Sequence, residues 1–304
     1  MGIGEEYDGR AVCVGNLDND PEGNNKIAVG SFQGILRIYS PQHREFKVED
    51  LLIETELGAP VLQVEAGRFS SSSGISLGIL HPRSFAVITL CGHPGTEEGA
   101  GSFYEIKPVF EVPLERTSYN FCYGPFGGER GKDFVCIQSM DGVLSFFEHE
   151  TLVFSRVLNN FLVPGPLCYL PRLDGFATGN AQFEIDCYKY STLAASAGAN
   201  VSAGDSLTAA KKVQEFWKFN LGEQILDIVV GRVSRGLGPQ QFDIIVLGEH
   251  TIVFLKENGA MRVQKHIDYH PSCCNVFTAQ EIEPGGANQH LIVGCFGAKL
   301  LVYQ

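Results

Sequence analysis

Residues 29–40 read VGSFQGILRIYS, and this pattern decides the fold class. An apolar run leads into a short turn that contains Gly34, and an alternating apolar run follows. This order is typical of a β-hairpin, because glycine tolerates the positive φ of a tight turn. The same pattern recurs in LGILHPRSFAVITL (77–90), IQSMDGVLSFFE (137–148), ATGNAQFEIDCYKY (177–190), VLGEHTIVFLKENG (246–259) and VGCFGAKLLVYQ (293–304). The sequence therefore predicts six hairpins.

Each hairpin belongs to a longer unit. Another apolar run precedes every hairpin, as in PVLQVEAGRF (60–69), and an amphipathic run follows five of them, as in TLVFSRVL (151–158). Units of four antiparallel strands at irregular spacing are typical of propeller blades, whereas solenoid repeats hold a tighter period. We predict an all-β propeller in a single domain over residues 1–304, with six four-stranded units. The sixth is incomplete, because Gln304 ends its third strand and the carboxyl end of the domain is truncated.

One segment departs from the strand pattern. Residues 192–212 read TLAASAGANVSAGDSLTAAKK and are rich in Ala, Ser and Gly. Such a composition buries little apolar surface, so we predict a flexible insertion between the third and fourth strands of the fourth unit.

Composition and charge limit the partners. Hydrophobic residues make up 44% of the 304 residues and charged residues 19%, which excludes general disorder. The formal net charge of -12 repels nucleic-acid phosphates and anionic lipids. No apolar run approaches the roughly 20 residues that span a bilayer. We expect no nucleic-acid partner, no direct membrane insertion and a cytoplasmic protein. The nine cysteines lack a framework spacing, which predicts reduced, buried thiols.

A calcium site is one interpretation of the loop at residues 18–23, DNDPEG. Its three carboxylates, Asp18, Asp20 and Glu22, alternate before a glycine, as in the first half of a calcium loop. Lys26 stands where such a loop needs a further carboxylate. The competing interpretation, which we prefer, is a hydrogen-bonded Asx-rich turn with no metal.

A zinc site is a second metal hypothesis, because His266, His270, Cys273 and Cys274 fall close together. On an extended strand the two histidines would lie roughly 13 Å apart, too far to share one ion unless the chain turns at Pro271. A strand that runs into a turn containing Pro271 is the preferred interpretation.

Catalytic motifs are not found. The segment GPFGGERGKD (124–133) ends in Gly-Lys like a phosphate loop, but Asp133 replaces the required Ser or Thr and a strand follows instead of a helix. No nucleophile elbow is present. We expect no catalytic residue, no metal and no cofactor, and an enzyme only through a constellation that the sequence does not reveal.

Several longer segments carry a family resemblance: KIAVGSFQGILRIYSP (26–41), EDLLIETELGAPVLQVEAGRF (49–69), GKDFVCIQSMDGVLSFFEHE (131–150), FLVPGPLCY (161–169) and NLGEQILDI (220–228). They resemble the amino-terminal region of the Bardet–Biedl syndrome protein 9 family, whose members are BBSome subunits. The resemblance implies a seven-bladed propeller at the start of a much longer protein. It also implies a non-catalytic scaffold in a coat-like complex that moves membrane proteins into and out of cilia.

The same resemblance implies partners and places. The partners would be other BBSome subunits, built from propellers and tetratricopeptide repeats, with membrane and Arf-like GTPase contact made through the assembled complex. The places would be the cytoplasm, the cilium and its membrane, and the basal body or centriolar region. Two alternatives stay open: an integrin-like calcium-binding propeller that uses Asp18, Asp20 and Glu22, and a propeller enzyme.

Overall fold

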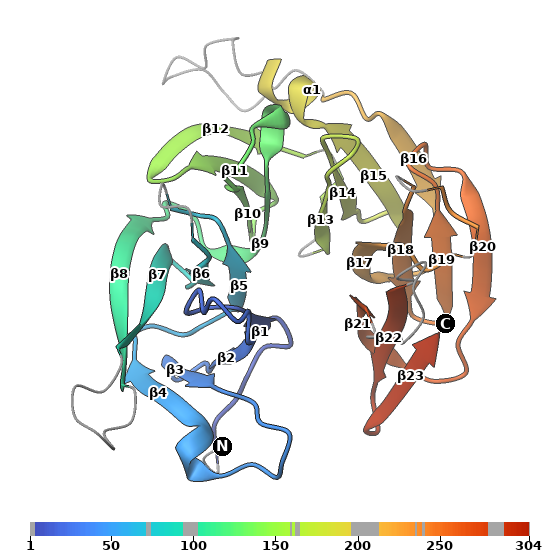
Figure 1. The fold of residues 1–304 in the computed structure, drawn as a ribbon. Helices are drawn as coiled ribbons and strands as arrows, with labels where there is room; N and C mark the ends of the chain where they lie inside the picture. Colours follow the sequence, from blue (N-terminus) through green and yellow to red (C-terminus); the bar gives the residue numbers. More distant parts are fainter. Residues whose placement is uncertain are drawn as a thin grey trace. The chain divides into compact units, whose positions relative to one another are not determined.

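The computed structural model describes residues 4–70, 74–93, 103–158, 160–161, 165–195, 213–234, 236–238, 241–278 and 289–303. These residues form antiparallel sheets in which strands consecutive in sequence are neighbours (Figure 1). The chain divides into two compact units, Met1–Ser155 and Arg156–Gln304. Each unit contains three sheets and is described by itself below.

Unit 1 holds the first three sheets, each with four strands. The first consists of β1 (Val12–Gly15), β2 (Lys26–Gly30), β3 (Ile35–Tyr39) and β4 (Leu51–Glu56). The second consists of β5 (Gln63–Gly67), β6 (Ser76–Leu80), β7 (Ser84–His93) and β8 (Phe103–Pro113). The third consists of β9 (Ser118–Gly124), β10 (Phe134–Ser139), β11 (Val143–Glu148) and β12 (Thr151–Val157). Two short 3-10 turns, Val48–Asp50 and Phe126–Gly128, lie in the loops.

Unit 2 holds the last three sheets. The fourth consists of β13 (Leu167–Leu170), β14 (Gly175–Gly179), β15 (Glu184–Lys189) and β16 (Trp217–Asn220), and the fifth of β17 (Ile225–Gly231), β18 (Asp243–Gly248), β19 (Thr251–Leu255) and β20 (Met261–His266). The sixth has three strands, β21 (Pro271–Thr278), β22 (Gln289–Cys295) and β23 (Lys299–Tyr303).

The predicted all-β fold and its six units are confirmed. Each hairpin read from the sequence forms two paired strands, and the runs before and after it form the first and fourth strands. The sixth sheet has three strands among the described residues, as predicted. A seventh blade and a single domain over residues 1–304 stay predictions.

The predicted insertion at 192–212 begins differently from expectation. Its first residues, 192–195, belong to a helix, α1 (Tyr190–Ala195), and the side chain of Leu193 is fully buried. The guanidinium of Arg156 also donates a hydrogen bond to the Leu193 carbonyl, at 2.7 Å. These two contacts hold the start of the segment in place, whereas residues 196–212 lie outside the described residues.

The core consists of layers between neighbouring sheets of one unit. Side chains alternate between the two faces of a strand, so a strand that packs on both faces is apolar throughout. In β6 all five residues are buried: Leu77 and Ile79 face the first sheet, and Leu80 faces the third. Corresponding layers in unit 2 join the fourth sheet to the fifth and the fifth to the sixth. Period-two alternation thus fixes which sheets face one another.

Close approach of sheets requires glycine at one inner position. A Cβ on Gly30 would lie 2.3 Å from the Val61 Cγ1 atom, which is nearer than any real contact. Val61 is fully buried in the layer between the first and second sheets. Glycine at position 30 therefore lets the segment before β5 pack directly on β2.

We predict that Gly142→Val destabilises the third sheet. Gly142 has φ +77° in the turn between β10 and β11, and a β-branched side chain in that conformation is expected to cost about 1 kcal/mol or more of unfolding free energy. Thermal denaturation of the full-length protein measures the effect. Gly9→Val is the control, since Gly9 is not in the left-handed region and a Cβ there meets nothing within 4 Å. Equal melting temperatures for the two variants would refute the turn assignment.

Candidate interaction surfaces

The loop with the calcium-candidate residues is cross-linked by hydrogen bonds. The Asn16 side chain accepts from the Asp20 amide and donates to the Asp20 carbonyl, both at 2.8 Å. The Asp20 carboxylate accepts from the Glu22 amide at 3.0 Å and from the Asn24 side chain at 2.8 Å. The backbone bond to Glu22 and then the Asn24 bond lower the Asp20 pKa. This geometry is that of an Asx turn.

A lysine partners the first candidate ligand. The Lys26 ammonium lies 3.1 Å from Asp18 Oδ2, and the two side chains are only 4% and 8% exposed. The other carboxylate oxygen, Asp18 Oδ1, is buried without a hydrogen-bond partner. The ammonium thus supplies the positive charge that buried Asp18 requires. Asp18 therefore pairs with a lysine, whereas Asp20 forms hydrogen bonds within the turn. Among the described residues, no group of three or more His, Cys, Asp or Glu has the geometry to hold a metal ion.

The zinc-hypothesis residues lie near a different histidine. The ring of His250 lies 6.4 Å from that of His266 and 6.1 Å from that of His270, measured between centroids. Pro271 opens β21, in which Cys273 is exposed and Cys274 is buried. The strand β20 ends at His266 and leads into a turn, as predicted, but the turn does not contain the proline, because Pro271 is already the first residue of β21.

The cysteines do not offer a nucleophile in the protein interior. All nine are thiols without a disulfide partner, and six are buried. Burial raises the pKa of the Cys13 and Cys187 thiols to about 12, and raises that of Cys122 and Cys274 as well. A thiol with a raised pKa is protonated at neutral pH and reacts slowly. The exposed thiol is Cys273.

An arginine network ties the amino-terminal segment to the first sheet. The Arg37 guanidinium on β3 donates to both oxygens of Glu5, at 2.6 and 2.9 Å, and to Glu54 of β4 at 2.5 Å. Tyr7 also donates its hydroxyl to Glu5. The bond from Arg37, followed by that from Tyr7, lowers the Glu5 pKa to about 2. The segment before β1 is therefore held across one face of the sheet by charge.

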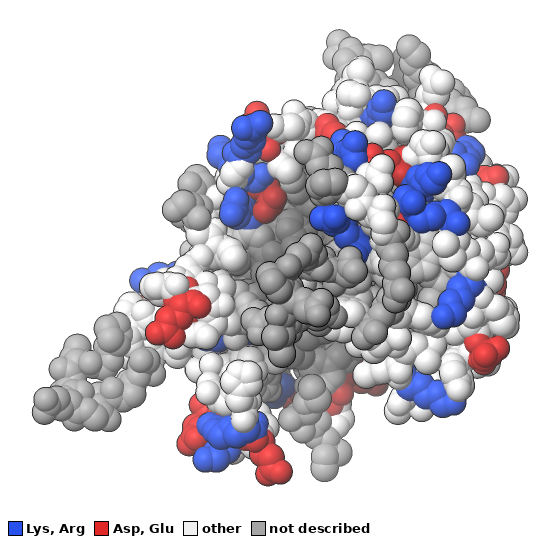
Figure 2. All heavy atoms as spheres, turned by 45° about the vertical axis from the view of Figure 1, so that its right-hand side comes forward, with Lys and Arg blue, Asp and Glu red and all other residues white. Residues whose placement is uncertain are grey.

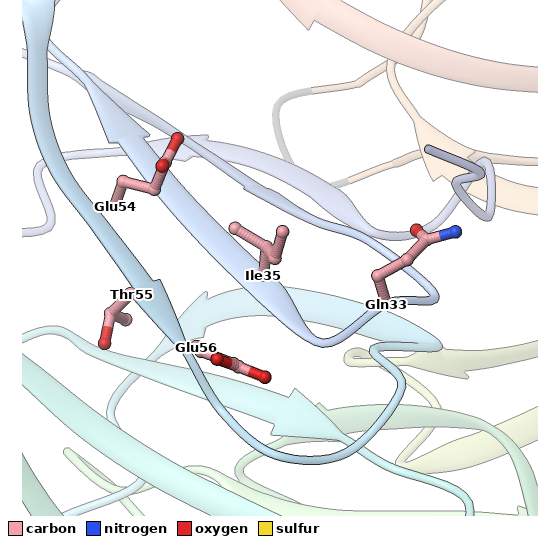
Figure 3. A pocket seen from close by; sticks show the side chains of 5 residues that line it. All are labelled: Gln33, Ile35, Glu54, Thr55 and Glu56. Atoms are coloured by element: carbon pink, nitrogen blue, oxygen red, sulfur yellow. The ribbon is translucent and has the colours of Figure 1, made fainter. Parts of the chain in front are cut away.

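A hollow of about 350 Å³ lies beside this network, lined by Gln33, Ile35, Glu54, Thr55 and Glu56. Figure 3 shows Gln33 in the turn before β3 and the two glutamates on β4. Glu54 is already paired with Arg37. The exposed valines of this sheet, Val12 and Val14, lie on β1, which is the edge strand opposite β4 and does not line the hollow.

A second hollow, of about 330 Å³, lies between the second and third sheets. One wall follows the end of β8, with Val112, Leu114 and Glu115, and the other belongs to the third sheet, with Ser145 and Leu152. Sequence reasoning missed this groove. The one available signal was a serine, Ser145, in a strand of otherwise bulky residues.

The surface carries charged side chains of both signs (Figure 2). On the face drawn in Figure 2, basic and acidic side chains are interspersed among uncharged residues, which is not the basic stripe of a nucleic-acid-binding surface.

Among the residues that the structure describes, no helix has both the length and the apolar character required to cross a bilayer.

Comparison with known proteins identifies the family. The family model described as PTHB1 N-terminal matches residues 1–304. The chain belongs to the PTHB1 family. Protein PTHB1 of Xenopus laevis is 41% identical over 312 residues, and that of Homo sapiens 40%, each aligned with 100% of this chain. A Caenorhabditis elegans pthb1 homolog is 25% identical over 229 residues, which cover 75% of the chain.

The chain spans only part of its relatives. It covers 36% of the length of the Xenopus PTHB1 protein and 34% of the human one. The family resemblance read from the sequence is confirmed.

Solved structures show the fold. A crystal structure of BBS1N in complex with ARL6DN is similar to this chain with a TM-score of 0.53 at 13% identity, covering 98% of this chain and 92% of that one. Saccharomyces cerevisiae Sqt1 gives a TM-score of 0.62 at 10% identity, covering 93% of this chain and 69% of that one. The six sheets of this PTHB1 chain are the blades of a β-propeller.

We predict that Lys26→Met lowers the unfolding free energy by about 3–5 kcal/mol, because it leaves the buried Asp18 carboxylate without its charge partner. Chemical denaturation of the full-length protein measures the change. Lys47→Met is the matched control: Lys47 pairs with Glu49 at 3.6 Å, but both side chains are more than half exposed, so the loss should stay below about 1 kcal/mol. If added calcium restored the stability of Lys26→Met, the loop would be a metal site.

We predict that the Arg37 network loosens only in strong acid. The Glu5 pKa is depressed to about 2 in the folded protein from an ordinary 4.5, so its contribution is present above pH 4.5 and is lost as the pH falls toward 2. NMR titration of the Glu5 side chain measures the pKa directly. In Arg37→Leu the Glu5 pKa should rise toward 4.5. An unchanged value in that variant would show that Arg37 does not hold the segment.

Proposed function

We propose that this chain is a non-catalytic scaffold domain of a BBSome subunit. The observation that carries the proposal is the match to vertebrate PTHB1 proteins at 40–41% identity over the whole chain. In this role the domain supports assembly of a coat-like complex that carries membrane proteins to and from cilia. Blades that pack through apolar layers form a rigid support whose outer strands and loops remain available to partners.

The partners in this proposal are proteins. They are other BBSome subunits, built from propellers and tetratricopeptide repeats, and membrane and Arf-like GTPase contact is made through the assembled complex. The solved propeller of BBS1N, which is described as a complex with ARL6DN, supports the idea that propellers of this kind bind proteins. The places of action are the cytoplasm, the cilium, the ciliary membrane as a peripheral complex, and the basal body or centriolar region.

The two alternatives gain no supporting observation from the described residues. The integrin-like calcium loop would need Asp18, Asp20 and Glu22 around one ion, whereas Asp18 is paired with Lys26. A propeller enzyme would need an activated group in a hollow. The two hollows described above are lined mainly by carboxylates, hydroxyls and aliphatic side chains, and neither contains a histidine or a cysteine.

Purification from cells tests the proposal. A tagged full-length protein that contains this chain should bring down the other BBSome subunits from ciliated cells, as identified by mass spectrometry. A second tagged version without residues 1–304 shows which subunits need this domain, and untagged cells supply the background. Recovery of no BBSome subunit with the full-length protein would overturn the proposed role.

A further inference from the structure

The groove between the second and third sheets lies wholly within unit 1. Its floor consists of core residues of the two sheets, including Val112, Ile137 and Phe147, which are 8%, 3% and 7% exposed. Several serine hydroxyls also line it, among them those of Ser139, Ser145 and Ser155. The groove is thus a hollow with an apolar base and a few polar groups, the composition that binding sites for protein or small-molecule groups share.

Small side chains create this hollow. Ser145 is the third residue of β11, and the third residues of the corresponding strands in the other sheets are Arg37, Ala86, Asp186, Val253 and Leu301. In unit 2, Val253 is buried between its sheets at 1% exposure and Leu301 packs in the next layer. Ser145 instead shares a hydrogen bond of 3.1 Å with Ser155 on β12. Two serines thus lie face to face at a position where an aliphatic side chain would fill the layer.

Apolar surface continues from the groove along β12. Leu152 and Val153 are 49% and 51% exposed. Val153 lies two residues before Ser155 and so shares its face of the strand. β12 is also the edge strand of the sheet order β12-β11-β10-β9. An extended segment laid beside the groove would therefore find both apolar contacts and a strand edge.

The rim of the groove is acidic. Glu115 and Glu150 line it, and neither makes an ion pair with a residue that the structure describes. The one basic residue of the lining, Arg116, is paired with Asp141. A partner with lysine or arginine beside its apolar side chain complements this rim, and the net charge of -12 attracts the same kind of partner.

We propose that this groove is a docking site for an extended segment of another protein, with an aliphatic side chain seated over Ser145 and Ser155 and a basic residue on either side. The aliphatic group fills the volume that Val253 and Leu301 fill in the two layers of unit 2. The flanking basic residues pair with Glu115 and Glu150. The inference rests on the proposed role as a partner-binding domain and specifies one surface and its chemistry.

Fluorescence anisotropy tests the proposal on the full-length protein. The probe is the labelled peptide KKVLVKK, compared with EEVLVEE, which reverses the charge, and KKSGSKK, which lacks the apolar side chains. The wild type should bind KKVLVKK at least about ten-fold more tightly than either comparison peptide, since affinity needs both the apolar and the charged contact.

Three variants locate the binding. Ser145→Leu fills the hollow and should weaken KKVLVKK by about ten-fold or more, while Glu115→Lys with Glu150→Lys should weaken it and reduce its salt dependence. Glu22→Lys with Glu249→Lys makes the same charge change on exposed sites elsewhere and should leave binding unchanged. Circular dichroism checks that each variant folds. If Ser145→Leu does not fold, Ser145→Val replaces it in the test, because the fifth sheet has valine, Val253, at the corresponding position.

Each contrary result overturns the groove proposal. The first is that the wild type does not bind KKVLVKK. The second is that it binds EEVLVEE as tightly as KKVLVKK. The third is that the folded Ser145 variants bind KKVLVKK as tightly as the wild type does. Sedimentation that showed wild-type dimers and monomeric Ser145→Leu would assign the groove to a second copy instead. The proposed function fails separately, when the wild-type protein recovers no BBSome subunit, so the two tests distinguish their failures.

Discussion

The face-to-face packing of neighbouring sheets is the interaction on which the rest of this structure depends. Each layer forms because apolar side chains alternate along the strands and meet those of the next sheet. The inner strands show this most clearly: β6 and β18 are buried along their whole length. Since burial of one large aliphatic side chain contributes roughly 1.5–3 kcal/mol, the layer between the first two sheets, with nine buried Val, Leu and Ile residues, dominates the stability of those sheets.

The layers also determine where charge is placed. A buried acidic or basic side chain within a sheet needs a partner, and other strands of the same sheet supply it. Asp186 of β15 lies opposite Lys218 of β16, with 3.1 Å between Oδ1 and Nζ, and Arg262 of β20 pairs with fully buried Asp243 of β18 at 2.9 Å. Asp186 and Asp243 therefore each have a basic partner within their own sheet, and these pairs offset the cost of burying the two carboxylates.

The strands could be predicted from the sequence, whereas the groove at Ser145 and Ser155 and the ion pair of Lys26 could not. The hairpins, the strand order and the incomplete sixth sheet follow from local period-two alternation and turn residues, so they could be predicted. The pairing of Lys26 with Asp18 could be suspected only as a defect in a calcium loop, because which carboxylate a lysine reaches depends on the folded turn. The groove could not be predicted, since a hollow depends on side-chain volumes contributed by two sheets. The burial of Leu193 was not predicted either, because the Ala- and Ser-rich segment around it indicates little apolar burial, whereas tertiary packing buries this one side chain.

We propose above all that this all-β propeller chain of the PTHB1 family serves as a surface for other proteins. The most direct test is cross-linking mass spectrometry. It is applied to the native full-length protein together with the proteins that co-purify with it. The account predicts links from exposed lysines of this domain, such as Lys47 and Lys107, to residues of other BBSome subunits. Links confined to the protein itself, with the same lysines fully reactive, would contradict it.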